Sequence, residues 1–122
     1  MLKTANIMLA CAAFLIQSNA VNARTRYLTA AELVREYSDT EVRPLTTMYV
    51  IGLIKGLNAY NMADNFVHGK KLYCLPSGLN LTSDQVVSMI EDLVDDKPEL
   101  SNEPDTLALL LALRKVFPCT GS

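Results

Sequence analysis

Two short stretches, Tyr73-Cys74-Leu75-Pro76 and Phe117-Pro118-Cys119, enclose the segment that decides the fold. Between them lie two helical patterns joined by a charged connector. Cys74 and Cys119 are the only cysteines after residue 11. If they pair, the bridge closes a loop of 45 positions (119 minus 74). By its effect on the entropy of the unfolded chain, such a bridge should stabilise the fold by about 4 kcal/mol. That energy is comparable to the net stability of a small domain.

The first 23 residues have the pattern of a secretory signal peptide. Lys3 gives a basic start, residues 7–16 form an apolar run, and Ala20 and Ala23 each end a small-residue cleavage pattern. The run is too short to span a bilayer, which takes about 20 apolar residues. An alternative is a lipid-attachment site at Cys11, but only about four apolar residues precede it, fewer than the usual 7–15. We expect cleavage after Ala20 or Ala23, export to the periplasm, and no membrane attachment afterwards.

Residues 24–122 suit one small domain. They number 99 (122 minus 23), which leaves no room for two domains. Loss of Lys3 takes the formal charge from −2 to −3, so no basic surface for nucleic acid is predicted. An oxidising compartment favours a disulfide between Cys74 and Cys119 over a metal pair, with two buried free thiols as the alternative.

Two capping boxes mark the starts of short helices. Thr29 and Glu32 form the first, and the apolar pattern that follows is interrupted at Ser38 after two to three turns. Thr82 and Gln85 form the second, in front of a helix with one apolar and one acidic side. A lysine–proline pair directly after residue 96 ends that helix.

The last helix is leucine-rich and lies between two prolines. Residues 99–105 are predicted to be a connector with room for one helical turn, and Pro104 prepares the start of the helix. Pro118 ends it. No segment shows the strict alternation of a half-buried strand. The predicted fold is therefore all-α, with four or five helices.

The longest helical pattern covers residues 45–63, and Pro44 suits its first position. Apolar side chains occur on nearly all sides, which predicts a central helix buried on several sides. Gly52 and Gly56 lie one turn apart on one face, and each costs about 1 kcal/mol of helix propensity relative to alanine. Their presence indicates close approach by another backbone. In the alternative interpretation, this glycine face is a contact between two copies of the chain.

Residues 64–71 gather polar and charged side chains and are predicted to form a surface loop, with Phe66 and Val67 turned inward. His68 is the only histidine of the chain. No neighbouring residues have metal-ligand spacing, and nothing indicates a nucleophile for the histidine to activate. We therefore predict no catalytic residue, no metal site and no cofactor, and we do not expect an enzyme.

The order of these segments resembles the Tai-type immunity proteins, which protect bacteria in the periplasm from peptidoglycan amidases delivered by type VI secretion. The resemblance covers about residues 49–119. The segments that carry it are Tyr49-Val50-Ile51-Gly52-Leu53-Ile54-Lys55-Gly56, Tyr73-Cys74-Leu75-Pro76, Leu81-Thr82-Ser83-Asp84-Gln85-Val86, Lys97-Pro98-Glu99 and Phe117-Pro118-Cys119. It implies a small, helical, disulfide-bonded protein, often a homodimer, that occludes the active-site cleft of an amidase.

Two segments are candidates for the surface that binds the toxin. Residues 64–71 are longer and more charged than the family pattern, and residues 100–105 are more acidic. The first segment offers His68 and Lys70, and the second offers Ser101, Asn102 and Glu103. A small polar loop suits a cysteine–histidine active site, which favours the second segment. The neighbouring acidic side chains Asp92, Asp95 and Asp96 would steer a basic partner toward it.

Two other functions are compatible with an exported helical domain. A small periplasmic chaperone would expose apolar surface on acidification, with the acidic residues 92–99 as the trigger. A single histidine and a modest charge excess give it little capacity for such a switch. The third hypothesis is an accessory subunit of a secretion or conjugation apparatus. Inhibition of a toxin remains the leading prediction.

Overall fold

The computed structural model describes residues 27–120, and within this range the chain is helical without a β-strand. The elements in chain order are α2 (Ala30–Ser38), α3 (Arg43–His68), α4 (Ser83–Asp96), the short 3-10 helix η2 (Pro98–Asn102) and α5 (Asp105–Val116). The all-α prediction is confirmed. The predicted signal peptide, residues 1–23, lies outside the described residues.

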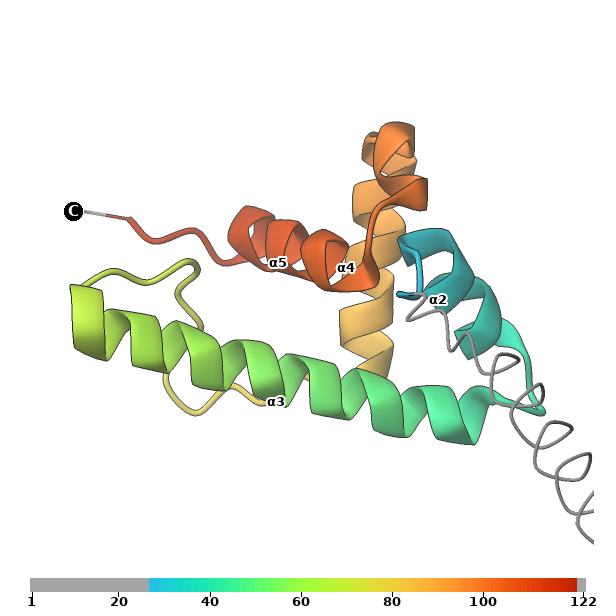
Figure 1. Ribbon diagram of the computed structural model, residues 1–122, viewed down its shortest axis with the longest axis horizontal. Coiled ribbons are helices and arrows are strands. Elements are labelled where there is room, and N and C mark those ends of the chain that lie inside the picture. Colours follow the sequence, from blue (N-terminus) through green and yellow to red (C-terminus); the bar gives the residue numbers. More distant parts are fainter. Residues whose placement is uncertain (1–26, 121–122) are drawn as a thin grey trace, which may run out of the picture.

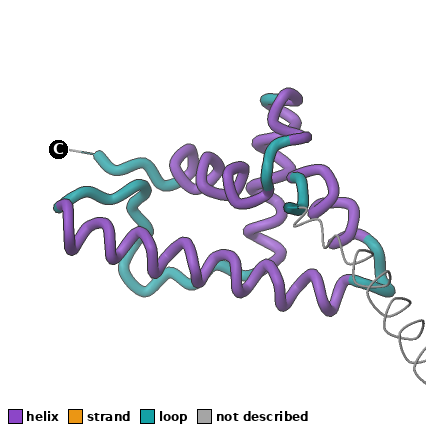
Figure 2. Tube along the Cα trace, viewed as in Figure 1, coloured by secondary structure: helices purple, strands orange, loops and turns teal. Residues whose placement is uncertain are grey.

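The helix α4 occupies the middle of the domain and packs against α2, α3, η2 and α5. In Figure 1 it rises from the level of α3 to η2 at the top, with α2 to one side. Figure 2 shows that the longest described non-helical stretch is the connection between α3 and α4, residues 69–82. This arrangement places η2 and the C-terminal end of α3 at different ends of the molecule.

Both capping boxes form as predicted. Thr29 accepts a hydrogen bond from the backbone N–H of Glu32, whose carboxylate accepts one from the N–H of Thr29. Thr82 and Gln85 make the same reciprocal pair at the start of α4. Each box satisfies N–H groups that a helix start leaves free. The proline at residue 98 ends α4 at Asp96 and opens η2, the single helical turn expected in the connector.

The core is built chiefly by three short helices. Its buried side chains from α2, α4 and α5 are Ala30, Leu33, Tyr37, Val86, Val87, Ile90, Leu93, Ala108, Leu109, Ala112 and Leu113. The long helix α3 adds only two buried apolar side chains, Val50 and Ile54. The central buried helix is therefore α4, and the prediction that residues 45–63 form it was wrong.

The physical reason is the length of α3. Its 26 residues extend about 39 Å at 1.5 Å per residue, and the neighbouring helices are too short to surround it. An added Cβ at Gly52 or Gly56 would meet nothing within 4 Å. No backbone of the described chain approaches these glycines closely, so that part of the prediction was also wrong, whereas a contact with a second copy stays a prediction.

The helix α3 also continues further than expected. It runs to His68 and ends at Gly69, whose φ of 67° lies in the left-handed region that favours glycine. Residues 64–68 are helical and not a loop, and Phe66 and Val67 point outward, 91% and 68% exposed. Polar composition did not stop the helix, because side chains such as Asp64 and His68 hydrogen-bond one turn apart along it.

The stretch 72–74 ties the far end of α3 to the end of α5. The side chain of Asn61 accepts from the N–H of Leu72 at 2.7 Å and donates to the carbonyl of Tyr73 at 2.9 Å. The fully buried Tyr73 donates its hydroxyl to Asn58 at 2.7 Å. Cys74 forms the predicted disulfide with Cys119, and its N–H donates to the carbonyl of Phe117. The disulfide prediction is confirmed.

Loss of this disulfide should destabilise the domain strongly. Replacing Cys119 with serine removes the constraint on a loop of 45 residues and should lower the free energy of unfolding by about 2–5 kcal/mol. Chemical unfolding of residues 24–122 measures the change. Titration of the denatured, unreduced wild-type protein should find no free thiol. Two reactive thiols, or an unchanged stability of the variant, would contradict the role given to the bridge.

Burial of Tyr73 should make the fold sensitive to alkaline pH. Burial raises the pKa of its phenol from 10.0 to about 12. The unfolded chain therefore ionises at a lower pH than the folded one, so stability is intact below about pH 10 and declines as pH rises toward 12. A Tyr73→Phe variant should lose less stability than wild type between about pH 9 and pH 11. Replacement of the exposed Tyr27 by Phe is the control, and identical pH slopes for wild type and Tyr73→Phe would refute the effect.

Candidate protein-binding surfaces

Residues 27–120 contain no group of three or more His, Cys, Asp or Glu residues that could hold a metal ion. In the same range, no helix is long and apolar enough to cross a membrane. His68, considered above for catalysis, lies exposed at the end of α3, with Nδ1 2.7 Å from Oδ1 of Asp64. This is a local i,i+4 pair on a helix surface. The surfaces of interest are those that suit another protein.

The first of these surfaces is the outward side of α3. Its buried side consists of Thr46, Val50, Ile54 and Asn61. The opposite side is exposed and, apart from the charged Lys55, apolar or small. We call it the α3 face: Leu45, Met48, Tyr49, Gly52, Lys55, Gly56, Ala59, Tyr60, Met62, Ala63 and Phe66. Exposed fractions of 73% for Leu45, 72% for Met48 and 91% for Phe66 are unusual for large apolar side chains. Contiguous apolar surface of this kind marks a protein contact.

The N-terminal half of the α3 face is held in place from below by a buried carboxylate. Tyr49 donates its hydroxyl to Oδ2 of Asp105 at 2.6 Å, and Asp105 is only 1% exposed. Oδ1 of Asp105 accepts from the N–H of Thr106, in the first turn of α5 where negative charge is favoured. Burial, followed by the bond to Asp105, raises the pKa of Tyr49. The bond links α3 to α5 and orients the tyrosine ring.

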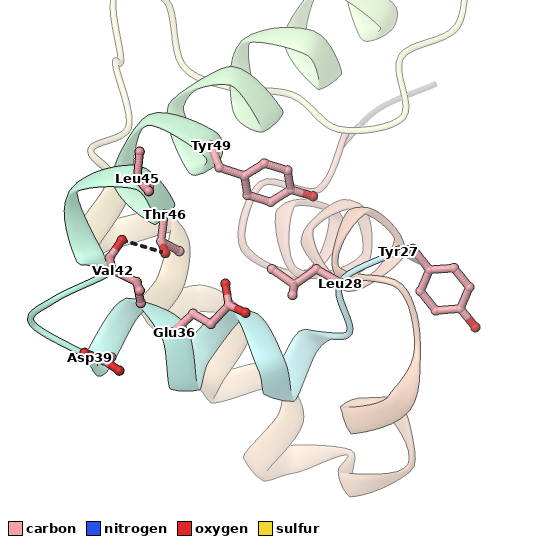
Figure 3. A pocket seen from close by; sticks show the side chains of 8 residues that line it. All are labelled: Tyr27, Leu28, Glu36, Asp39, Val42, Leu45, Thr46 and Tyr49. Atoms are coloured by element: carbon pink, nitrogen blue, oxygen red, sulfur yellow. Dashed lines mark hydrogen bonds between the residues drawn. The ribbon is translucent and has the colours of Figure 1, made fainter. Parts of the chain in front are cut away.

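A hollow of about 560 Å³ lies where α2 meets the start of α3, and it continues into the α3 face. Its lining residues are Tyr27, Leu28, Glu36, Asp39, Val42, Leu45, Thr46 and Tyr49. Figure 3 shows Glu36 rising from α2 toward the gap beneath α3, while Asp39 lies at the edge. The hollow is therefore acidic, while Arg43, the first residue of α3, pairs with Asp84 beside it. The other end of α3 is basic, since Lys70 and Lys71 follow it directly.

A second hollow, of about 480 Å³, lies between α2 and the C-terminal half of α4. We call it the α2–α4 hollow, and its lining residues are Ala31, Val34, Arg35, Glu91, Asp92, Val94 and Asp95. Its α4 residues belong to the half of the helix that leads into η2. In Figure 1 this end of α4 is the one away from α3. Two separate surfaces are thus available for two different contacts.

The five residues predicted to bind the toxin fall into two groups that the structure keeps apart (Figure 1). His68 and Lys70 lie at the C-terminal end of α3, whereas Ser101, Asn102 and Glu103 lie in and directly after η2. The hydroxyl of Ser101 donates a hydrogen bond to the carbonyl of Pro98 at 2.6 Å. Asn102 and Glu103 are exposed, close in sequence to the α2–α4 hollow.

Sequence reasoning missed the contribution of α2 to this second surface. Ala31, Val34 and Arg35 follow the spacing i, i+3, i+4 and so share one side of the helix. That spacing was a usable signal, but only an apolar pattern after Glu32 was recognised, with Val34 counted in it, and no second, partner-facing side was assigned to the helix. The acidic residues after position 90 were recognised, but not that the apolar side chains Val34 and Val94 lie between them.

Comparison with protein-family models matches residues 29–119 to the Rap1a immunity proteins. The match begins at the capping residue Thr29 and ends at the disulfide residue Cys119, so it covers the whole helical domain. Searches of the curated proteins and of the solved structures find no match. An immunity protein acts by binding a toxin, which agrees with a surface built for protein contacts. The chain belongs to the Rap1a immunity protein family.

Proposed function

We propose that this chain is a periplasmic immunity protein that binds a peptidoglycan amidase delivered by type VI secretion and blocks its active-site cleft. The observation that carries the proposal is the family match over the complete disulfide-closed domain. Two features support the finer statement. The first 23 residues have the pattern of an export signal, and a disulfide suits an oxidising compartment.

The end of the molecule formed by η2 and α4 is the surface we assign to the toxin. A segment that enters a cleft must project and be rigid, because ordering a flexible loop weakens binding. The turn at η2 is fixed at both sides: the N–H of Lys97 donates to Leu93, and the carbonyl of Glu103 accepts from Ala30 at 3.0 Å. An isolated β-bridge joins Thr29 to Pro104 directly after it. Asn102 and Glu103 are therefore displayed on a rigid support.

The α3 face is the surface we assign to a second copy of the chain. Two-fold symmetry would place two α3 helices antiparallel, with Gly52 and Gly56 near the centre of the contact. The acidic hollow with Glu36 at the start of each helix would then lie opposite Lys70 and Lys71 of the second copy. Opposite charge at the two ends, and a surface between them that is apolar or small except for Lys55, support a self-complementary contact. Such a dimer leaves both η2 ends free for toxin.

The immunity proposal predicts that a peptidoglycan amidase is encoded beside the gene for this chain. Export of that amidase to the periplasm of a test bacterium should cause lysis, and co-expression of residues 1–122 should restore growth. The matched control is the same chain without residues 1–23, which should give no protection because it stays in the cytoplasm. Lysis despite the full chain would contradict the immunity role. Equal protection by the shortened chain would contradict a periplasmic site of action.

The dimer proposal predicts opposite effects of one double substitution on folding and on association. In Gly52→Ala with Gly56→Ala, the added methyl groups meet no atom of the described residues within 4 Å outside their own helix backbone. The double substitution should stabilise the isolated helix by up to about 1 kcal/mol per position. Added methyl groups at the centre of a close helix contact should weaken dimerisation at least about tenfold. Sedimentation at micromolar concentration measures association, and unfolding at high dilution measures the monomer.

The control for this experiment is Asn65→Ala, which also raises helix propensity. Asn65 is exposed and lies one turn after the buried Asn61, off the α3 face. It should leave dimerisation unchanged. A wild-type protein that sediments only as a monomer of about 11 kDa, taking roughly 110 Da per residue, would remove the dimer from the account.

A further inference from the structure

The α2–α4 hollow combines an apolar floor with carboxylates at its rim. Val34 and Val94 are half-buried and pack against the edge of the core. Glu91, Asp92 and Asp95 are exposed around them. With a volume of about 480 Å³, the hollow is within the range that receives ligands or side chains of another molecule. The floor suits a hydrocarbon stem, and the rim suits a positive charge.

These three carboxylates lack the ion pairs that neighbouring acidic residues make. Asp96 lies 2.9 Å from Nζ of Lys115, and Asp84 lies 3.0 Å from the guanidinium of Arg43. Glu91, Asp92 and Asp95 are in no ion pair within residues 27–120. Among the described residues that line the hollow, Arg35 is the one cation, and it also lines a neighbouring hollow with Glu32 and Glu36. Negative charge at the rim is therefore in excess.

The position of Asp95 in the last turn of α4 makes its negative charge less favourable still. The C-terminal end of a helix carries a partial negative charge, so carboxylates there are disfavoured and cations are favoured. The last turn of α4 contains no basic residue. A cation brought by a partner would offset both the mutual repulsion of the carboxylates and the repulsion of Asp95 by the helix end. The free protein thus retains an unfavourable arrangement that a basic partner relieves.

We propose that the α2–α4 hollow receives an arginine side chain from the toxin, which specifies the partner chemistry of the function proposed above. Arginine fits better than lysine for two reasons. Its guanidinium is planar, weakly hydrated and able to bond two carboxylates at once, such as Asp92 and Asp95. Its stem can lie over Val34 and Val94 while the charge stays at the rim. Because α2 and α4 both pack against η2, the arginine anchors the toxin beside Asn102.

The first test uses a small probe and needs no toxin. The peptide acetyl-Gly-Arg-Gly-amide is titrated into ¹⁵N-labelled residues 24–122, with the citrulline peptide as the neutral isostere. Amide shifts should move at residues 31–35 and 91–95 for the arginine peptide, with affinity at least about tenfold higher than for citrulline. The double variant Asp92→Asn/Asp95→Asn should abolish the difference. Absence of shifts in these residues, or equal response to both peptides, overturns the proposal.

The second test uses the amidase encoded beside the gene. Asp92→Asn/Asp95→Asn should weaken its binding at least about tenfold at low salt and less at high salt. Asp64→Asn, which removes one charge at the far end of α3, should leave affinity unchanged and serves as the control. Undiminished affinity of the double variant overturns the arginine site while leaving immunity intact. Failure of the wild-type chain to bind the amidase counts against the proposed function, and the peptide titration then still decides whether the hollow binds arginine.

Discussion

The backbone between residues 72 and 74 connects the far end of α3 to the end of α5 through bonds of different kinds. Asn61 holds it by both of its side-chain groups, the buried Tyr73 fills the space beneath it, and Cys74 joins it covalently to Cys119. The rest of the structure depends on this junction, because α3 buries only Val50 and Ile54 as apolar side chains. Without the junction, the C-terminal half of a helix about 39 Å long would extend past its supports.

This junction and the bond from Tyr49 to Asp105 fix α3 at two separated points. Because α3 is held at both points, its wide apolar side stays exposed and does not turn inward to pack against the core of the domain. The domain thereby keeps two surfaces with different chemistry, the apolar α3 face and the acidic end at η2. In the proposed assembly the first is covered by a second copy, and the second remains open to a basic toxin.

Local signals in the sequence were sufficient for most of the fold. The reciprocal capping pairs such as Thr29 with Glu32, the proline at residue 98 and the isolated cysteine pair each determine structure within a few residues or through one covalent bond. The burial of α3 could not be predicted, because a helix that is apolar on all sides gives no direction for its core. Its end was also misjudged, since the left-handed Gly69 stops the helix and the charges before it do not.

The binding surfaces were only partly visible in the sequence for a similar reason. Acidic residues after position 90 indicated a basic partner, but the floor that α2 provides beneath them depends on packing between distant segments. Hydrogen–deuterium exchange of the chain, alone and bound to the toxin we propose for it, a peptidoglycan amidase, tests the two-surface account most directly. The account predicts that toxin binding slows exchange in residues 31–35 and 91–103. In residues 45–66, exchange in the complex should be the same as in the proposed dimer without toxin. New protection confined to residues 45–66 would contradict it, because the toxin would then occupy the surface assigned to the second copy.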